Sequence, residues 1–303
     1  MNMPSIEELS PEAVSQSPLE EQHAPEASLP DKPVVLNESD TTHAAFNLRD
    51  IWAYRELLFF LTWRDIKVRY KQTAIGAAWA IIQPLSIVIV FAVFFGLLIG
   101  VPTEGMPFIV FFYCAMLPWM FFSTALTLSS GSLINSSNLI TKIYFPRAII
   151  PIAAVAAGLI DLLITTAILI GMLPFYGLRA TAAGFLMLPA LLFVTLCLST
   201  AFGILLSALT VKYRDIRHAL PFVLQIWMYV TPLVYPLTVI PEKWRWLMYI
   251  NPLTGVVEGI RSAVWGKPFN WTAIGISLVI TILMLFVSAS AFRRIENSFA
   301  DLI

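Results

Sequence analysis

Charge is scarce in this chain: 13% of its 303 residues are Asp, Glu, Lys or Arg, whereas 58% are hydrophobic. Soluble domains carry about 25% charged residues, so this balance excludes an ordinary soluble fold. Cysteine is also scarce, and Cys114 and Cys197 both lie in long apolar runs, which excludes a disulfide scaffold and predicts two small core residues. No Cys/His spacing suited to a metal occurs either. The composition therefore indicates a membrane protein.

A second absence concerns nucleotides. The glycine-rich phosphate loop G-x-x-x-x-G-K-[ST] does not occur, and Gly266-Lys267 is followed by a proline. The chain therefore cannot cradle ATP phosphates by this device. We expect it to bind no cofactor or metal, so the energy for an active process would come from a partner or an ion gradient.

What the sequence does contain is a set of long uncharged runs. A helix needs ~20 mostly apolar residues to cross about 30 Å of hydrocarbon with its backbone hydrogen-bonded internally. Six runs are long enough, which predicts an all-α membrane protein with six transmembrane helices. They are about 76–100, 107–134, 148–173, 183–211, 219–240 and 269–292.

Lys and Arg are divided unequally between the two sides that these spans define. The flanks on one side carry eleven bases and those on the other side carry five. Because basic flanks stay in the cytoplasm, both termini are predicted to be cytoplasmic.

Asp161 is the one charge inside a predicted span. A lone membrane carboxylate is a functional candidate by default. Without a charged partner it can also be protonated, or hydrogen-bonded to Thr165, Thr166 or a neighbouring helix. We expect the structural role.

The first 46 residues hold nine acids and one base, with six prolines among them. This composition offers too little apolar surface to offset the entropy of ordering. It predicts a disordered, acidic, Pro-rich cytoplasmic tail over 1–46, either a spacer or a docking segment, ahead of a transmembrane domain over 47–303.

A helix is predicted over 51–71, where aromatic and apolar side chains recur at helical spacing. Glu56, Asp65 and Arg69 are expected on another face, which predicts an amphipathic helix in the membrane interface with its bases toward lipid headgroups. The apolar series is Trp52, Phe59, Trp63, Ile66 and Tyr70.

The stretch 241–267 is too long for a turn and too polar for a span. Two short helices that dip back into the outer leaflet fit both facts, and a hairpin lying flat on the outer surface is the alternative. Pro252 and Gly255 are predicted at the bend between them. Pro232 and Pro236 interrupt the preceding span, because each lacks a backbone donor. With Pro252 they would form a periplasmic gate, or else a static kink.

Five motifs together resemble, in the same order, the permease subunits of ABC-type polysaccharide exporters, which move O-antigen, capsule or teichoic acid chains. The resemblance covers about 51–294 and does not extend to 1–46. The motifs are "TWRDIKVRYKQTAIGAAWAIIQP" (62–84), "LITKIYFPRAIIP" (139–151), "VKYRDIRH" (211–218), "TPLVYP" (231–236) and "INPLTGVVEGIR" (250–261).

The resemblance implies a homodimer in the bacterial inner membrane, with a translocation path between the subunits and two separate nucleotide-binding ATPase subunits that hold ATP and Mg²⁺. It also implies a coupling helix over 136–146, capped by Ser136 or Ser137 and running through Tyr144, that fits a cleft of the ATPase. A loop buried against the chain's own interfacial helix is the alternative. The implied coupling residues are Leu139, Ile140, Lys142, Ile143, Tyr144 and Arg147.

The cargo that the resemblance implies is a lipid-linked polysaccharide. Guanidinium and ammonium groups suit phosphate oxygens, so a basic cluster could gather the diphosphate of the lipid carrier, although anchoring to membrane lipids explains each residue singly. The cluster is Arg64, Lys67, Arg69 and Lys71.

Aromatic rings stack on the C–H faces of sugars, which makes tyrosines near the outer half of the bundle candidates for a sugar path. Interface anchoring and packing are the alternatives. The candidates are Tyr229, Tyr235 and Tyr249.

Other functional classes fit less well. An ion-coupled secondary transporter normally needs several intramembrane ionisable or unwound sites, and Asp161 alone is a poor relay. A membrane-embedded transferase would need convergent acids with His or a metal. An ABC exporter of a small lipid or drug stays open as an alternative, and no nucleic-acid partner is expected.

Overall fold

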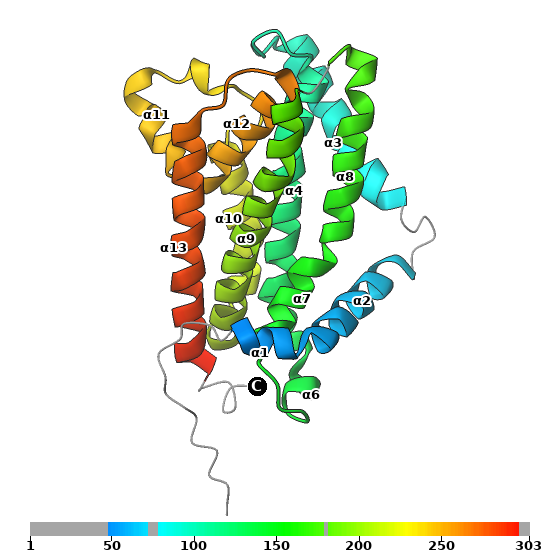
Figure 1. Cartoon of the computed structure of the whole chain (residues 1–303), viewed down its shortest axis with the longest axis vertical. Helices are drawn as coiled ribbons and strands as arrows, with labels where there is room; N and C mark the ends of the chain where they lie inside the picture. The colour runs from blue at the N-terminus through cyan, green and yellow to red at the C-terminus, as the bar shows by residue number, and fades with distance from the viewer. Residues whose placement is uncertain (1–47, 72–77, 179–180, 297–303) are drawn as a thin grey trace, which may run out of the picture. The chain divides into compact units, whose positions relative to one another are not determined.

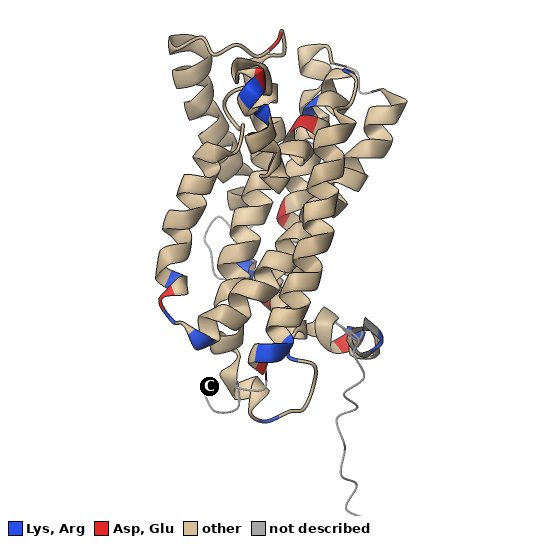
Figure 2. Cartoon of the chain, turned by 90° about the vertical axis from the view of Figure 1, so that its left-hand side faces the viewer, with Lys and Arg blue, Asp and Glu red and all other residues tan. Residues whose placement is uncertain are grey.

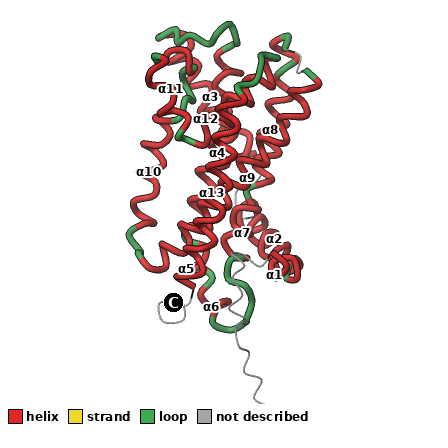
Figure 3. Tube along the Cα trace, turned by 60° about the vertical axis from the view of Figure 1, so that its left-hand side comes forward, coloured by secondary structure: helices red, strands yellow, loops and turns green. Residues whose placement is uncertain are grey.

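The structure is a computed structural model that describes residues 48–71, 78–178 and 181–296. The chain is divided into two units, Met1–His43 and Ala44–Ile303, and every described helix lies in the second unit. The predicted tail over 1–46 lies outside the described residues. The described residues are almost entirely helical and contain no strand, as Figures 1 and 3 show. The all-α membrane fold is confirmed.

Five helical segments are long and apolar enough to cross a membrane among the described residues. Each matches one of the predicted uncharged runs. They are α3 (Trp79–Phe91) continuing as the π-helix η2 (Ala92–Leu98), α4 (Phe108–Ser130), α7 (Ile149–Ala157) with α8 (Leu159–Met172) and η3 (Pro174–Tyr176), α9 (Ala182–Lys212), and α13 (Trp271–Glu296).

The predicted span over 219–240 is the exception. Its helix α10 (Ile216–Val230) has 15 residues, and at Thr231 the backbone becomes extended. Because Pro232 disfavours helical geometry in the residue before it, the helix ends there. A 3₁₀ turn, η4 (Leu237–Val239), follows. The sixth span therefore stays a prediction.

The bundle is centred on α4 and α9. Helix α4 is largely buried against other helices, whereas α3 with η2 is largely exposed. Helix α9 packs against α4 and α13, and α12 (Pro252–Trp265) packs against α9, α13 and α4 (Figure 1). Helix α3 and much of α10 therefore present apolar side chains outward.

Small residues set the closest approaches between these helices. A methyl group added at Gly255 of α12 would lie 2.2 Å from the carbonyl oxygen of Ala273 on α13, and one at Gly184 of α9 would lie 2.1 Å from that of Ala263. Gly255 was predicted at the bend of the 241–267 stretch, which is wrong: it lies inside α12 as a packing residue.

The bend itself lies at Ile250 and Asn251, between α11 (Glu242–Tyr249) and α12. Asn251 caps α12 by accepting a hydrogen bond from the backbone N–H of Leu253, and Pro252 occupies the first helical turn, where its missing N–H is not needed. Two short helices thus occupy the predicted stretch. Their depth in the bilayer stays a prediction.

The predicted interfacial helix forms α1 (Leu48–Ala53) and α2 (Arg55–Lys71). Helix α2 packs on α7 (Figure 1), and Leu61 lies buried in the cluster that includes Ile149 and Ile150. Phe59 and Trp63 stack on each other and are exposed. The two-faced arrangement expected from the sequence is incomplete, because apolar side chains lie on both the bundle side and the outer side of α2.

Between α4 and α7 the chain forms two short helices, α5 (Ser132–Asn135) and α6 (Ser137–Ile140). The coupling helix was predicted to run through Tyr144, which is wrong: α6 ends at Ile140 and a turn follows. Ser136 does precede the helix, but its side chain makes no cap hydrogen bond.

Candidate functional site

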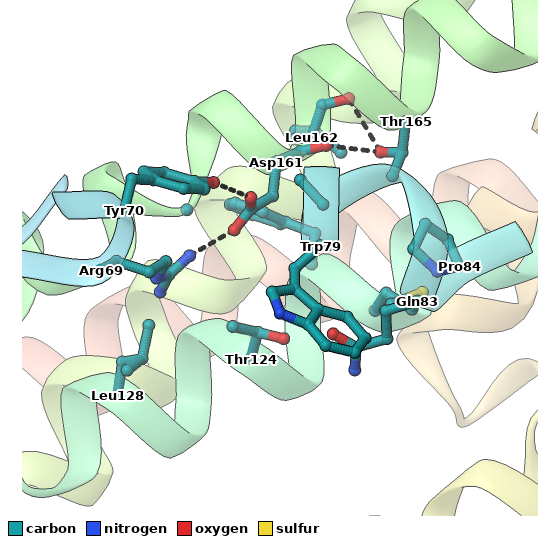
Figure 4. Close-up of a pocket in the computed structure, with 14 residues that line it drawn as sticks. Arg69, Tyr70, Trp79, Gln83, Pro84, Thr124, Leu128, Asp161, Leu162 and Thr165 are labelled. Atoms are coloured by element: carbon teal, nitrogen blue, oxygen red, sulfur yellow. Dashed lines mark hydrogen bonds and ion pairs between the residues drawn. The ribbon is translucent and has the colours of Figure 1, made fainter. Parts of the chain in front are cut away.

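Asp161 lies near the start of α8 and meets two side chains from the end of α2. The guanidinium Nη1 of Arg69 and the hydroxyl of Tyr70 donate to the two carboxylate oxygens of Asp161 (Figure 4). Thr165 donates to the backbone carbonyl of Asp161 at 2.8 Å. The expectation that Asp161 has no charged partner is therefore wrong, because α2 folds back beneath α8 and brings in a base that lies 92 positions away.

Tyr70 is a donor in this cluster over a wide pH range. Burial and the hydrogen bond to Asp161 raise the pKa of Tyr70 to about 12. The phenol is therefore protonated at neutral pH. The sequence placed Tyr70 and Arg69 on different faces of the helix, and the structure turns both toward Asp161.

A cavity of about 360 Å³ adjoins this cluster. We call it the interfacial cavity, since it lies between the interfacial helix α2 and α3, α4 and α8 (Figure 4). Its lining combines the charged cluster with neutral polar groups and apolar walls. The principal lining residues are Arg69, Tyr70, Trp79, Gln83, Thr124, Asp161, Leu128, Phe121, Leu162 and Thr165.

A second cavity of about 370 Å³ lies between α2, α5 and α7. Arg69 and Leu128 line both cavities. The second cavity has Ser132, Asn135 and Ser136 in its wall, next to the predicted coupling segment. Arg69 therefore borders both spaces.

The four bases predicted to act as one cluster are divided by the structure. Arg64, Lys67 and Lys71 line a groove of about 320 Å³ together with exposed aromatic side chains of α2. Arg64 pairs with Asp65 at 2.8 Å, whereas Arg69 turns toward α8. Three of the four predicted side chains therefore share the groove, whereas Arg69 lines the interfacial cavity; Arg64 and Arg69 both line the second cavity.

The predicted coupling residues separate into exposed and packed groups. Lys142, Ile143 and Tyr144 are exposed, with Tyr144 91% accessible. Leu139 and Ile140 pack partly against the cluster around Leu61.

The residues that follow are bound to the domain. Phe145 is buried in the same apolar cluster, and Arg147 donates to the backbone carbonyl of Glu296 at the end of α13, at 3.0 Å. The free apolar surface of this loop is therefore confined to Ile143 and Tyr144.

The predicted sugar-path tyrosines do not converge on one cavity. Tyr229 is 65% exposed on α10, and the Tyr235 hydroxyl donates to its carbonyl oxygen at 3.3 Å. The Tyr249 hydroxyl accepts from Asn270 at 3.1 Å, between α11 and α13. Tyr229 and Tyr235 are thus neighbours, and Tyr249 belongs to a different contact.

The three predicted gate prolines are buried. Pro232 and Pro236 lie in the segment that Arg261 of α12 holds, whereas Pro252 begins α12 itself. The Nη2 of Arg261 donates to the carbonyl of Leu233 at 2.8 Å, and its Nη1 pairs with Glu258 at 2.9 Å. The guanidinium carbon lies 3.6 Å from the ring centre of Phe111 on α4. Sequence reasoning counted Arg261 among the flanking bases and missed this role; the Glu258/Arg261 spacing of three was the available signal.

The outer loops meet at Glu104, which sequence reasoning also missed. Its carboxylate accepts from Lys267 and from Thr238, each at 2.8 Å, and so joins three connections of the chain. The ammonium of Lys267 holds the pKa of Glu104 below its usual value. Glu104 has a positive φ of 58°, a strained geometry that these partners stabilise.

Most charged residues lie toward the two ends of the bundle, with long apolar helices between them (Figure 2). The described residues hold no group of acids, His and Cys that could bind a metal. These features define a multi-pass membrane protein.

Comparison with known proteins identifies the family of this membrane protein. Residues 56–265 match the ABC-2 type transporter family, and the chain belongs to this family. Two relatives are the O-antigen export system permease proteins RfbA of Klebsiella pneumoniae, 27% identical over 82% of this chain and 95% of the relative, and of Myxococcus xanthus, 25% identical over 84% and 98%. A third is the polysialic acid transport protein KpsM of Escherichia coli, 25% identical over 78% and 92%. The resemblance read from the five motifs is confirmed, and the chain is a membrane component of a transporter rather than an enzyme.

Proposed function

We propose that this chain is the membrane-spanning subunit of an ATP-driven exporter that moves a lipid-linked polysaccharide, such as O-antigen or capsule, across the bacterial inner membrane. The supporting observation is its similarity, over nearly the full length of the relatives, to proteins named for O-antigen export and polysialic acid transport. Two copies would form the translocation path between them, with both termini in the cytoplasm.

The energy would come from two ATPase subunits that bind ATP and Mg²⁺. The loop after α6 suits docking to them, because Ile143 and Tyr144 are exposed apolar side chains at the end of the bundle, and exposed apolar surface of this kind marks interaction sites. Lys142 would add charge to the contact. Arg147, which holds α13, would position the loop rather than touch the partner.

The lipid diphosphate would bind in the groove of α2. Arg64, Lys67 and Lys71 surround this groove, and their positive charge suits phosphate oxygens. Phe60 and Trp63 in the same groove would contact the lipid chain at the membrane interface.

The outer end of the path would be formed by α10 and the segment after it. Tyr229 and Tyr235 lie together there, and rings offer flat faces for sugars. The proline segment held by Arg261 would be the gate, opening as the polymer passes.

The proposal is tested in a strain that lacks this chain, by measuring glycan at the cell surface after complementation. Ile143→Ser with Tyr144→Ala should abolish surface glycan and ATPase binding, while Asn138→Ala, an exposed polar change on α6 just before this loop, should complement. Export that persists when the ATPase is absent and stops with an uncoupler would refute the ATP-driven class.

A further inference from the structure

Arg69 and Asp161 in the interfacial cavity have hydrogen-bonding capacity beyond the bonds that they make to each other and to Tyr70. Nη1 of Arg69 donates to Asp161, and the guanidinium group has five N–H donors in all. Each oxygen of Asp161 has one partner, which leaves further acceptor capacity. Both charges can therefore bind a further group without separating from each other.

Both charges are also accessible. The side chains of Arg69 and Asp161 are 25% and 29% exposed, and both line the interfacial cavity. A volume of about 360 Å³ is within the range of small-ligand sites. Gln83 and Thr124 add neutral hydrogen-bonding groups to the same space.

One wall of the cavity reaches the exposed apolar surface of the bundle. Trp79 lines the cavity and is 49% exposed, and Ile82 on α3 is 41% exposed. Leu163 on α8 is exposed as well. A ligand in this cavity would thus have its polar part beside Arg69 and Asp161 and a route for an apolar part along α3 and α8.

The opposite charges of Arg69 and Asp161 determine which kind of polar group the cavity would favour in a ligand. An anionic group alone would contact Arg69 but would lie close to the Asp161 carboxylate, and like charges at short range repel strongly where the dielectric constant is low. A group with one negative and one positive charge meets both residues with the favourable sign.

We propose that the interfacial cavity binds a zwitterionic phospholipid headgroup, of which phosphoethanolamine is the best match: the phosphate meets Arg69 and the primary ammonium meets Asp161. The ammonium of ethanolamine has N–H donors for the carboxylate, which the quaternary ammonium of choline lacks. The bound lipid would fix the end of α2 against α8. This lipid is a resident of the membrane, separate from the cargo and the α2 groove of the proposed function.

The test uses the full-length chain, delipidated in non-ionic detergent, and native mass spectrometry with phospholipids of identical acyl chains. Phosphatidylethanolamine should bind at least about tenfold more tightly than phosphatidylglycerol, which has the phosphate and lacks the cation. Phosphatidylcholine should fall between them. N-acetylated phosphatidylethanolamine, whose amine is neutral, should bind like phosphatidylglycerol.

Variants locate the site. Asp161→Asn should remove the preference for phosphatidylethanolamine over phosphatidylglycerol, and Arg69→Gln should weaken the binding of both lipids. Glu56→Gln and Arg55→Gln, matched changes of an exposed acid and an exposed base elsewhere on α2, should bind as the unchanged chain does. Thermal unfolding midpoints establish that each variant is folded.

Equal binding of the four lipids by the unchanged chain would overturn the inference without any variant. So would a folded Asp161→Asn protein that keeps the preference. Because neither cargo nor ATPase is present in this experiment, its failure leaves the proposed export function standing, and a failure of export leaves the lipid site standing.

Discussion

Asp161 joins two parts of the chain that have no other charged contact in the described structure. Its carboxylate lies at the start of α8, and its partners lie at the end of α2. Uncharged runs can reveal the acid, but the base that pairs with it depends on how α2 returns under the bundle. The pairing of Arg69 with Asp161, which are 92 positions apart, could therefore not be predicted from the sequence.

Replacing Asp161 with Asn should destabilise the protein. The change leaves the guanidinium of Arg69 without its counter-charge and weakens the acceptor for Tyr70, so we expect a loss of about 1–3 kcal/mol in the free energy of unfolding. Denaturant unfolding in detergent measures it. Asp65→Asn is the control, since that exposed pair contributes about 1 kcal/mol or less. Equal losses in the two variants would contradict this account of the cluster.

Replacing the buried Arg261 with Met should be more damaging. Met fills similar volume but leaves the carbonyl of Leu233 and the carboxylate of Glu258 without a donor, which predicts a loss of about 3 kcal/mol. Arg245→Met is the matched control, because Arg245 also follows a Glu by three positions but is more exposed. The midpoint of thermal unfolding should fall clearly for Arg261→Met and little for Arg245→Met; similar shifts would show that the network is unimportant.

The Glu104/Lys267 pair predicts a pH dependence of the outer loops. Lys267 lowers the pKa of Glu104 in the folded chain, so the stabilisation is complete above the pKa of the unfolded chain and is lost as the pH falls through the lower folded value. The pair is partly exposed, so the contribution is about 1 kcal/mol or less. Unfolding of the unchanged chain and of Glu104→Gln should converge in this acid range, and a constant difference down to the lowest pH would contradict the assignment.

At the scale of elements, the long uncharged runs were the reliable signal. Five of the six predicted spans correspond to helices that are long and apolar enough. The span over 219–240 was predicted from the absence of charge alone, whereas Pro232 terminates α10 at Val230. Helix α2 misled in another way: its apolar residues lie on several sides, so spacing could not decide which of them face the bundle.

The packing of α12 against α13 should depend on Gly255. Gly255→Ala would place a methyl group 2.2 Å from the Ala273 carbonyl, so the helices must separate, and we expect a loss of about 1–3 kcal/mol. Gly275→Ala on α13 is the control, because a methyl group there meets nothing within 4 Å. Thermal unfolding should distinguish the two variants. A neutral Gly255→Ala would mean that α12 can move at little cost.

For the whole molecule, the distribution of bases predicts the topology. Reporter fusions at Lys142 and Arg214 should report the cytoplasm, and fusions at Lys243 and Lys267 should report the periplasm, since basic flanks stay inside. Glycosylation-type or phosphatase reporters measure this directly. Lys142 outside the cell would remove the coupling loop from reach of any cytoplasmic ATPase.

The family could be recognised from the sequence because its five motifs, which include junctions between helices, carry Pro and charged residues and occur in the same order as in the family. The sites could be predicted less well. The motifs identify which loops matter, but the division of the α2 bases between two surfaces and the role of Arg261 follow from contacts among three or more elements. Such contacts leave no regular spacing in the chain.

The shortness of α10 has a consequence for the bilayer. At about 1.5 Å per residue, 15 helical residues span about 22 Å, less than the ~30 Å of a hydrocarbon core. A membrane in contact with its exposed Phe222 and Ile226 must therefore dimple inward to match, or admit water beside the proline segment. Under the proposed export function, a polar polymer that passed beside α10 would cross a thinner apolar layer than it would beside the longer helices.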